Sequence, residues 1–224
     1  MPARRGRARR ASGDRKQAGE IAASKAALVP LFPLHTVLFP GGVLPLHIFE
    51  ERYRQLVRER RDFGVLLIRR GSEVGPGRAE DLHDVGTVAT LERIEALADG
   101  RFSVTARGLY RFNLLSLDHS RPYLMGRVQR LADPPPSARP KLLSLLERYL
   151  AAHGVVVAAQ LALEAQQRAV WLVGSVLQVE PALRQRLLES GDPELAEAML
   201  AEELSRLGSI GRLGVVHPRP PSPN

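Results

Sequence analysis

The feature that most constrains this 224-residue chain is a run from Ala26 to Phe49 without a single Asp, Glu, Lys or Arg. A basic segment precedes the run, so the two together imitate a secretory signal or a membrane anchor. Four prolines nevertheless interrupt it, and Gly41-Gly42 lies near its middle. Each proline removes a backbone donor that lipid cannot replace, and no small-residue cleavage pattern ends the run. We therefore interpret the run as strands and turns of a soluble domain.

The pieces between these interruptions are short and apolar, which is typical of strands separated by turns. They predict strands at residues 28–34, 37–39 and 43–48. Charge returns at Glu50, and the apolar residues then recur with helical spacing. This change of period predicts an amphipathic helix that ends near Asp62.

The segment that follows, up to residue 132, is predicted to be β-structure because it consists of short apolar or alternating stretches bounded by turn residues. Asp99-Gly100 is a strong hairpin signal, since both central positions of a tight turn favour positive φ. Gly108 is expected to separate two strands. The strands predicted here are residues 64–68, 101–106, 109–117 and 123–131.

The remainder is predicted to be helical. A proline run after Asp133 stops the sheet. Asp192 followed by Pro193 is a helix start, with an acceptor at the cap and a preset φ in the first turn. Glycines 154, 191 and 208 are predicted to end helices. The helices predicted here are residues 140–153, 157–177, 181–190 and 193–207.

These signals predict five segments. A disordered basic tail (1–27) is followed by a β-rich barrel (28–132), a Pro-rich linker (133–139), a helical subdomain (140–210) and a flexible Pro-rich tail (211–224).

The net charge of +8 is unevenly distributed along the chain. Residues 1–27 hold eight basic and two acidic side chains and so carry +6, which leaves +2 for residues 28–224. Basic tails bind polyanions weakly and without sequence preference. The nearly neutral body therefore does not favour a nucleic-acid partner.

The residues that disulfides, metal sites and a nucleotide-binding loop require are missing from the chain. The chain has no cysteine, which excludes disulfides and thiolate metal sites and fits a reducing cytoplasm. Its six histidines show no metal-ligand spacing. A nucleotide-binding loop needs glycines followed by Lys-Ser or Lys-Thr, and none of the three lysines (Lys16, Lys25 and Lys141) lies in such a loop. We expect no cofactor and no metal.

Five blocks of sequence, in their order and spacing, resemble the amino-terminal domain of Lon-type ATP-dependent proteases. The blocks are PLFPLHTVLFPGGVLPLHIFEERYRQLV from Pro30, VGTVA from Val85, DGRFSV from Asp99, GLYRF from Gly108 and PYLMGRV from Pro122. The helical part resembles the bundle that follows in stand-alone members of this family. The resemblance implies an α+β fold, with a β-rich, PUA-like pseudobarrel that embeds one helix and an α-helical bundle after it. In the full proteases this region recognises unfolded or tagged proteins and helps to assemble the oligomer.

The protease class that this family serves uses a serine activated by a lysine. Lys141 is the one lysine of the predicted folded body, and Ser144 lies three residues further on at a predicted helix start. A nucleophile needs a shielded base, whereas this pair is expected on a solvated helix face. With neither a nucleotide loop nor a catalytic dyad, the chain is predicted to be non-catalytic and ATP-independent.

We interpret the chain as a module that binds unfolded or extended polypeptide segments through sheet-edge pairing and shallow apolar contacts. Phe49 and Tyr53 would supply apolar area, while Glu51 and Arg52 would lie on the exposed side of the helix. In the alternative interpretation, Phe49 and Tyr53 only pack the helix on the barrel. The candidate peptide-binding residues are Phe39, Gly41, Gly42, Phe49, Glu51, Arg52 and Tyr53.

Two other functions stay open. The chain could be an adaptor or regulator that docks on a protease, a chaperone or another partner. It could also bind RNA, because the Lon barrel resembles pseudobarrels of RNA-modifying proteins. Against RNA stand the nearly neutral body and the few aromatics, one Trp, four Tyr and six Phe. A homodimer through the helical part (Leu195, Met199 and Leu204) is a further alternative. We expect a cytoplasmic protein without a membrane partner.

Overall fold

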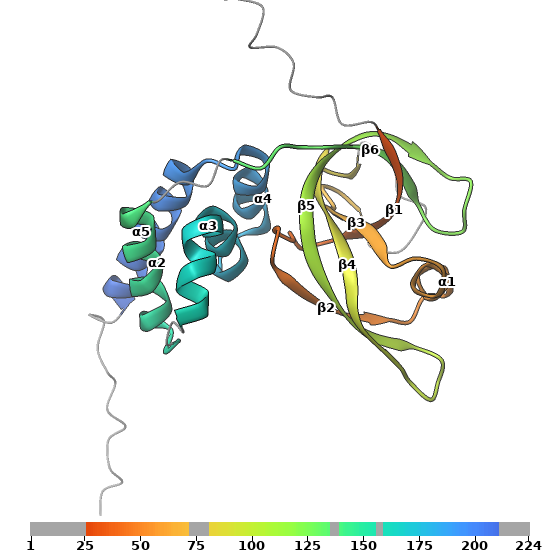
Figure 1. Ribbon diagram of the computed structural model, residues 1–224, viewed down its shortest axis with the longest axis horizontal. Coiled ribbons are helices and arrows are strands. Elements are labelled where there is room, and N and C mark those ends of the chain that lie inside the picture. Colours follow the sequence, from red (N-terminus) through yellow and green to blue (C-terminus); the bar gives the residue numbers. More distant parts are fainter. Residues whose placement is uncertain (1–25, 72–80, 135–138, 156–158, 211–224) are drawn as a thin grey trace, which may run out of the picture.

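A barrel of strands and a group of helices lie side by side in the computed structural model, joined along one side of the barrel (Figure 1). The structure describes residues 26–71, 81–134, 139–155 and 159–210. The strands are β1 (Ala27–Leu34), β2 (Val43–Ile48), β3 (Asp62–Leu67), β4 (Val85–Ala96), β5 (Phe102–Asp118) and β6 (Met125–Arg130). The helices are α1 (Glu51–Glu59), α2 (Pro140–Ala152), α3 (Ala159–Val176), α4 (Pro181–Ser190) and α5 (Pro193–Ile210). The predicted α+β class is confirmed.

The sheet closes into a barrel because its last strand returns to an inner one. The strand order is β2-β5-β4-β3-β1-β6, and β6 also pairs with β5. The strands β1 and β3 are parallel, and the other pairs are antiparallel. Strand β2 lies outside the closed part and pairs with the first half of β5. The long β5 therefore serves two neighbours on one side, β2 first and β6 afterwards.

Glycines make room for large side chains inside the barrel. Leu31 and Phe112 are fully buried there. A Cβ at Gly64 would lie 2.8 Å from the Phe112 ring, and one at Gly126 would lie 2.6 Å from the Leu31 side chain. Because side chains do not tolerate such distances, these glycines let two bulky residues fill a narrow interior.

The predicted amphipathic helix is present as α1. It buries Tyr53, Leu56 and Val57 against the barrel, and the Tyr53 ring stacks on Phe32 with centroids 3.9 Å apart. The helix ends earlier than predicted, at Glu59, because the next residue is already extended and β3 begins at Asp62.

The strand predicted at residues 37–39 is wrong: these residues form a buried loop. Their carbonyl groups bond elsewhere than in a sheet. The Thr87 hydroxyl donates to the Leu38 carbonyl at 2.6 Å, and the Arg184 guanidinium donates to the Val37 carbonyl at 3.1 Å. The Phe39 carbonyl accepts from the Gly42 N–H at 2.9 Å, which forms a turn. Side chains from distant elements thus replace the strand neighbour that this segment lacks.

The break predicted at Gly108 is also wrong, because β5 runs through it with only an irregularity in its pairing to β4. The glycine is required for a different reason. A Cβ at this position would lie 2.3 Å from the Phe39 carbonyl oxygen. Gly108 therefore allows the buried loop to cross β5 closely.

The helix signals are confirmed in most cases. Gly191 ends α4 in the left-handed conformation with φ of 62°. Asp192 caps α5, since its Oδ1 accepts from the Glu194 N–H at 2.8 Å. The predicted stop at Gly208 is wrong, because α5 continues to Ile210. Residues 1–25, 135–138 and 211–224 of the predicted tails and linker lie outside the described residues. None of the described helices combines the length and apolar character that a bilayer crossing requires.

Candidate functional site

The predicted peptide-binding residues do not form one surface. Phe39 is 1% exposed and points into the helical part. Its ring lies 6.2 Å from the Trp171 ring, and the Arg184 guanidinium lies 5.7 Å from it. A Cβ at Gly174 of α3 would lie 2.3 Å from the ring. The Phe39 ring therefore reaches from the barrel into the space that Gly174 of α3 leaves free, and we call this ring the plug.

Gly41 and Gly42 form the turn between this plug and β2. Gly41 has φ of 82°, which favours glycine, and its N–H donates to the Gly108 carbonyl at 2.8 Å. The Arg107 guanidinium donates to the Gly41 carbonyl at 3.0 Å. Both backbone groups of Gly41 are thus hydrogen-bonded to residues of β5. The turn is therefore fixed on β5, and it sets where β2 begins.

The residues after β2 divide between surface and core. Phe49 is 59% exposed. Glu51 is also exposed and pairs with the guanidinium groups of Arg54 and Arg58. Tyr53, by contrast, is 3% exposed and belongs to the core beneath α1.

Arg52 was expected on the exposed side of α1, but its side chain is mostly buried. It pairs with Glu50 at 2.9 Å and lies over the Tyr53 ring at 4.4 Å from the centroid. Of the predicted set, only Phe49 and Glu51 are thus classed as exposed, and both lie beyond the far end of β2.

Strand β2 itself connects the turn with Phe49 and has one open edge. The Gly42 carbonyl accepts from the Gly108 N–H at 2.9 Å, and the antiparallel register continues from Val43 opposite Arg107. In such a ladder every second residue exchanges hydrogen bonds with the same neighbour. The backbone groups of Val43, Pro45 and His47 therefore point away from β5.

No second strand covers this side of β2 among the described residues. Val43 is 53% exposed, and Pro45 and His47 are exposed as well. Figure 1 shows β2 starting beside the helical part and running along the outside of the barrel towards α1. We name the outward backbone groups of Val43, Pro45 and His47 the open edge.

The open edge could have been found from sequence. A proline inside a strand lacks the N–H that an inner ladder position needs, so it marks a strand with one unpaired side. Pro45 lies within the correctly predicted strand 43–48 and carries this signal.

Two arginines, the buried Arg111 and the partly buried Arg184, hold the helical part on the barrel. The Arg111 guanidinium donates to the carbonyls of Leu188 at 2.8 Å and Ala132 at 2.6 Å, and it lies 4.8 Å from the Trp171 ring centroid. Burial lowers the pKa of Arg111, and likewise that of Arg184. We name this contact of β5 and the loop 37–39 with α3 and α4 the junction.

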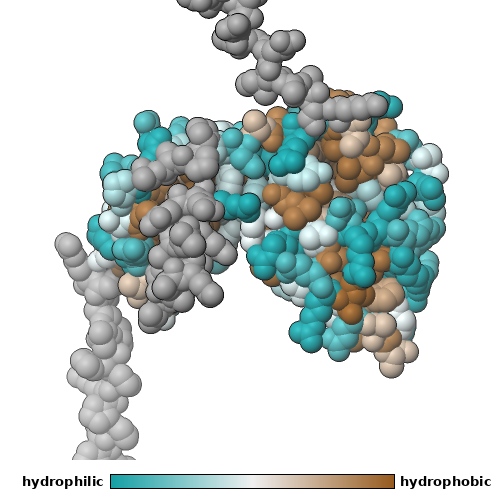
Figure 2. All heavy atoms as spheres, in the orientation of Figure 1, coloured by the Kyte–Doolittle hydropathy of each residue, from teal (hydrophilic) through white to brown (hydrophobic). Residues whose placement is uncertain are grey.

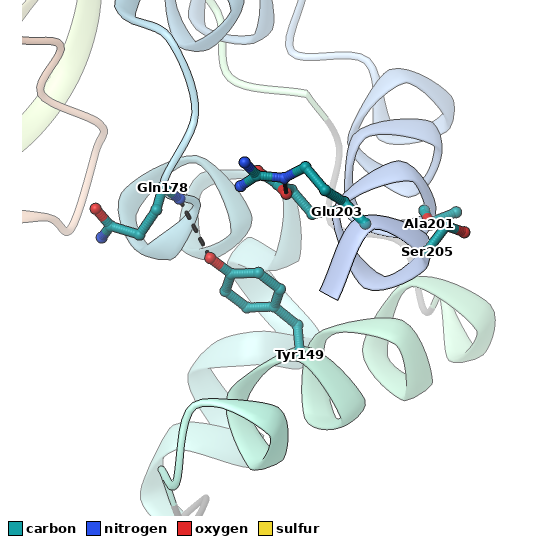
Figure 3. Close-up of polar contacts among 6 residues, drawn as sticks. Tyr149, Gln178, Ala201, Glu203 and Ser205 are labelled. Carbon is teal, nitrogen blue, oxygen red and sulfur yellow. Dashed lines mark hydrogen bonds and ion pairs between the residues drawn. The ribbon is translucent and has the colours of Figure 1, made fainter. Parts of the chain in front are cut away.

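The helical part also encloses a polar cluster of its own (Figure 3). The Gln178 N–H donates to the Tyr149 hydroxyl at 3.2 Å. The Glu203 carboxylate is buried and receives two hydrogen bonds from Arg206, at 2.6 and 2.8 Å. A buried carboxylate needs such a partner, so we assign these contacts to the stability of the bundle.

The described residues hold no group of three or more His, Asp or Glu side chains arranged for a metal ion. Lys141 and Ser144 are both exposed, and the lysine pairs with Glu197 at 2.9 Å. This environment does not shield a base, so Lys141 and Ser144 do not have the geometry of a serine–lysine catalytic pair.

Comparison with known proteins decides the family. The sequence model described as the ATP-dependent protease La (LON) substrate-binding domain matches residues 28–206. The chain belongs to this family. The Lon protease of Anaeromyxobacter dehalogenans is 38% identical over 112 residues, which cover 48% of this chain and 13% of that protein. Lon protease 2 of Herpetosiphon aurantiacus is 28% identical over 212 residues, 88% of this chain and 25% of that protein. The LON-type chain thus spans a quarter or less of these two curated relatives.

Solved structures agree with the fold. A Lon N-terminal domain protein from Xanthomonas campestris superposes with a TM-score of 0.59 and 28% identity, covering 78% of this chain and 98% of that one. The N-terminal domain of Lon protease from the Mycobacterium avium complex gives a TM-score of 0.50 at 17% identity, covering 80% and 98%. The latter likeness shows the fold alone. The resemblance to the Lon amino-terminal domain is therefore confirmed.

Proposed function

We propose that this LON-type domain is a non-catalytic recognition module that binds extended segments of other proteins by strand addition to β2. The observation that carries the proposal is the open edge. The three residues that carry it are exposed, and pairing with β5 already fixes β2 in register. Backbone pairing tolerates many sequences, which a module for unfolded proteins requires.

The surroundings of the open edge suit this mode of binding. On the face of the barrel in Figure 2, hydrophobic areas are separated by hydrophilic side chains. Val43 and Phe49 lie at opposite ends of β2, and both are exposed. A bound segment would therefore gain affinity mainly from main-chain hydrogen bonds, with apolar contacts at the two ends.

The binding is expected to be independent of nucleotide and to leave the ligand intact. The test is the affinity of the 224-residue chain for a fluorescein-labelled, carboxymethylated unfolded protein, measured by anisotropy with and without Mg-ATP. Saturable binding that ATP does not change, with no cleavage on a gel, is the expected result. Cleavage or ATP turnover would contradict the non-catalytic assignment.

A matched pair of variants at one residue separates backbone from side chain. His47→Pro removes an N–H of the open edge, whereas His47→Ala keeps it and removes the imidazole. Because one hydrogen bond contributes about 0.5–1.5 kcal/mol, His47→Pro is expected to weaken binding about 2- to 12-fold. His47→Ala is expected to bind as the wild type does. Equal affinities for all three proteins would show that the ligand binds elsewhere.

A further inference from the structure

The open edge lacks one donor. Val43 and His47 each present an N–H and a C=O to the outside, whereas Pro45, between them, presents only its C=O. An incoming strand of ordinary residues can use every group that the edge offers. Only its own carbonyl opposite the Pro45 nitrogen stays unpaired, and that carbonyl belongs to the ligand and can face water.

A second copy of β2 fits this edge poorly. Two β2 strands related by a two-fold axis would pair antiparallel. Centred on Pro45, such a pair places two prolines opposite each other, so that their carbonyls meet without a donor. Shifting the register by two residues places each Pro45 opposite Val43 or His47, and again leaves carbonyls unpaired. Each of these pairings of two copies therefore loses hydrogen bonds that a foreign strand would keep.

Charge at the start of β2 suggests the direction of a foreign strand. Arg168 lies at the kink of α3 with an exposed side chain, and its Nη1 is 3.4 Å from where a Cβ of Gly41 would be. The Arg107 guanidinium donates to the carbonyl of the same glycine and is already paired with the Glu92 carboxylate. An antiparallel partner of β2 has its carboxyl end at Val43 and beyond, which brings a terminal carboxylate towards the guanidinium of Arg168.

We propose that the open edge of β2 accepts the carboxyl-terminal end of another polypeptide in antiparallel orientation, and that Pro45 excludes a second copy of the chain from the same edge. The ligand part rests on the proposed function. The exclusion of a second copy is independent of it. Proline on an edge strand protects a sheet from edge-to-edge association in general, and here it does so without closing the edge to a ligand.

The exclusion is tested by restoring the missing donor. Pro45→Val is expected to form a concentration-dependent dimer in sedimentation velocity, whereas the wild type shows no such dimer. Pro45→Thr serves as the second variant, and thermal unfolding confirms that each is folded. The double variant Pro45→Val with His47→Pro again lacks a donor and is expected to dimerise less than Pro45→Val. Folded Val and Thr variants that sediment as the wild type does would overturn the exclusion, as would a wild-type dimer that His47→Pro dissolves and His47→Ala does not.

The direction is tested with an unstructured decapeptide that ends either in a free carboxylate or in an amide. The wild type is expected to bind the free acid several-fold more tightly. Arg168→Gln is expected to reduce this preference, while Arg69→Gln, an exposed arginine outside the site, is expected to keep it. Equal affinity of the wild type for acid and amide would overturn the orientation. Failure of the wild type to bind either peptide would contradict the proposed function and would leave the sedimentation result to decide the role of Pro45.

Discussion

The junction and the open edge are made by consecutive stretches of chain, yet their backbone groups meet opposite conditions. In the loop 37–39, every carbonyl accepts a hydrogen bond from a described group, two of them from side chains of β4 and α4. Four residues further on, the outward groups of β2 meet no neighbouring strand within the described part of the chain. The turn at Gly41-Gly42 separates the two conditions.

This difference indicates what each region contributes. Buried polar groups cost stability when a partner is removed, so the junction is expected to be sensitive to substitution. Exposed backbone groups can bond to water, so the open edge costs the fold little and stays available to a ligand. The predictions below test this contrast.

The largest effect is expected at the aromatic plug. Phe39→Ala removes a fully buried ring and should lower the free energy of unfolding by about 3–5 kcal/mol. Phe49→Ala, at the exposed end of β2, should change it by no more than about 0.5 kcal/mol. Urea unfolding of the two variants measures both values. Similar losses at the two positions would remove the distinction between the junction and the open edge.

The next effect is expected at the buried guanidinium of the junction. Arg111→Met leaves the carbonyls of Leu188 and Ala132 without their donor and should cost about 2–4 kcal/mol. The control is Arg130→Met, an exposed arginine that lies over the Tyr110 ring at 4.4 Å and should cost at most about 1 kcal/mol. Thermal unfolding of the two variants measures both losses of stability. If Arg111→Met were as stable as the control, the junction would be held by its apolar contacts alone.

The smallest effect is expected at the end of α1, away from both regions. The Tyr123 hydroxyl donates to Glu59 at 2.7 Å, and this bond, followed by one from Gln55, lowers the pKa of Glu59 below its ordinary value of 4.5. Because the pKa is lowered, the ionised Glu59 carboxylate stabilises the folded state fully above pH 4.5. This stabilisation is lost as the pH falls through the pKa of Glu59 in the folded state.

Glu59→Gln should therefore show a slightly lower Tm than the wild type at neutral pH, and the two should converge below pH 4.5. Tyr123→Phe removes the same bond from the other side and should lose the same pH dependence. Melting curves between pH 3 and pH 7, each point about 0.5 unit apart, would show the convergence over the window that the pKa predicts. Parallel curves over this range would contradict a role for the Tyr123–Glu59 bond.

Local patterns predicted most elements because each depends on neighbours in sequence. The helix α1 follows from apolar spacing, the end of α4 follows from Gly191, and the start of α5 follows from Asp192. The candidate site was predicted less well. Phe39 and Tyr53 carry the same apolar character as Phe49, and no local pattern indicates that the first two are buried and the third exposed.

The two errors in the β-rich part, at residues 37–39 and at Gly108, have one physical cause, which is contact with residues far away in the chain. Residues 37–39 are apolar enough for a strand, but Arg184 and Thr87 take the carbonyls that a strand partner would use. Gly108 has the sequence character of a strand break, but its lack of a side chain lets the Phe39 carbonyl pass close to β5. A sequence pattern contains neither partner.

The sequence by itself determined the strand that bears Pro45 and most of the helices, because periodicity, turn residues and the missing N–H of proline are local properties. It also indicated the family, through the resemblance of five blocks of sequence. Only the tertiary structure decided which side of that strand is open and which aromatic side chain is a plug. Both depend on what packs against a segment, and the helices dock on the barrel through hydrogen bonds between residues 147 and 100 positions apart in the chain.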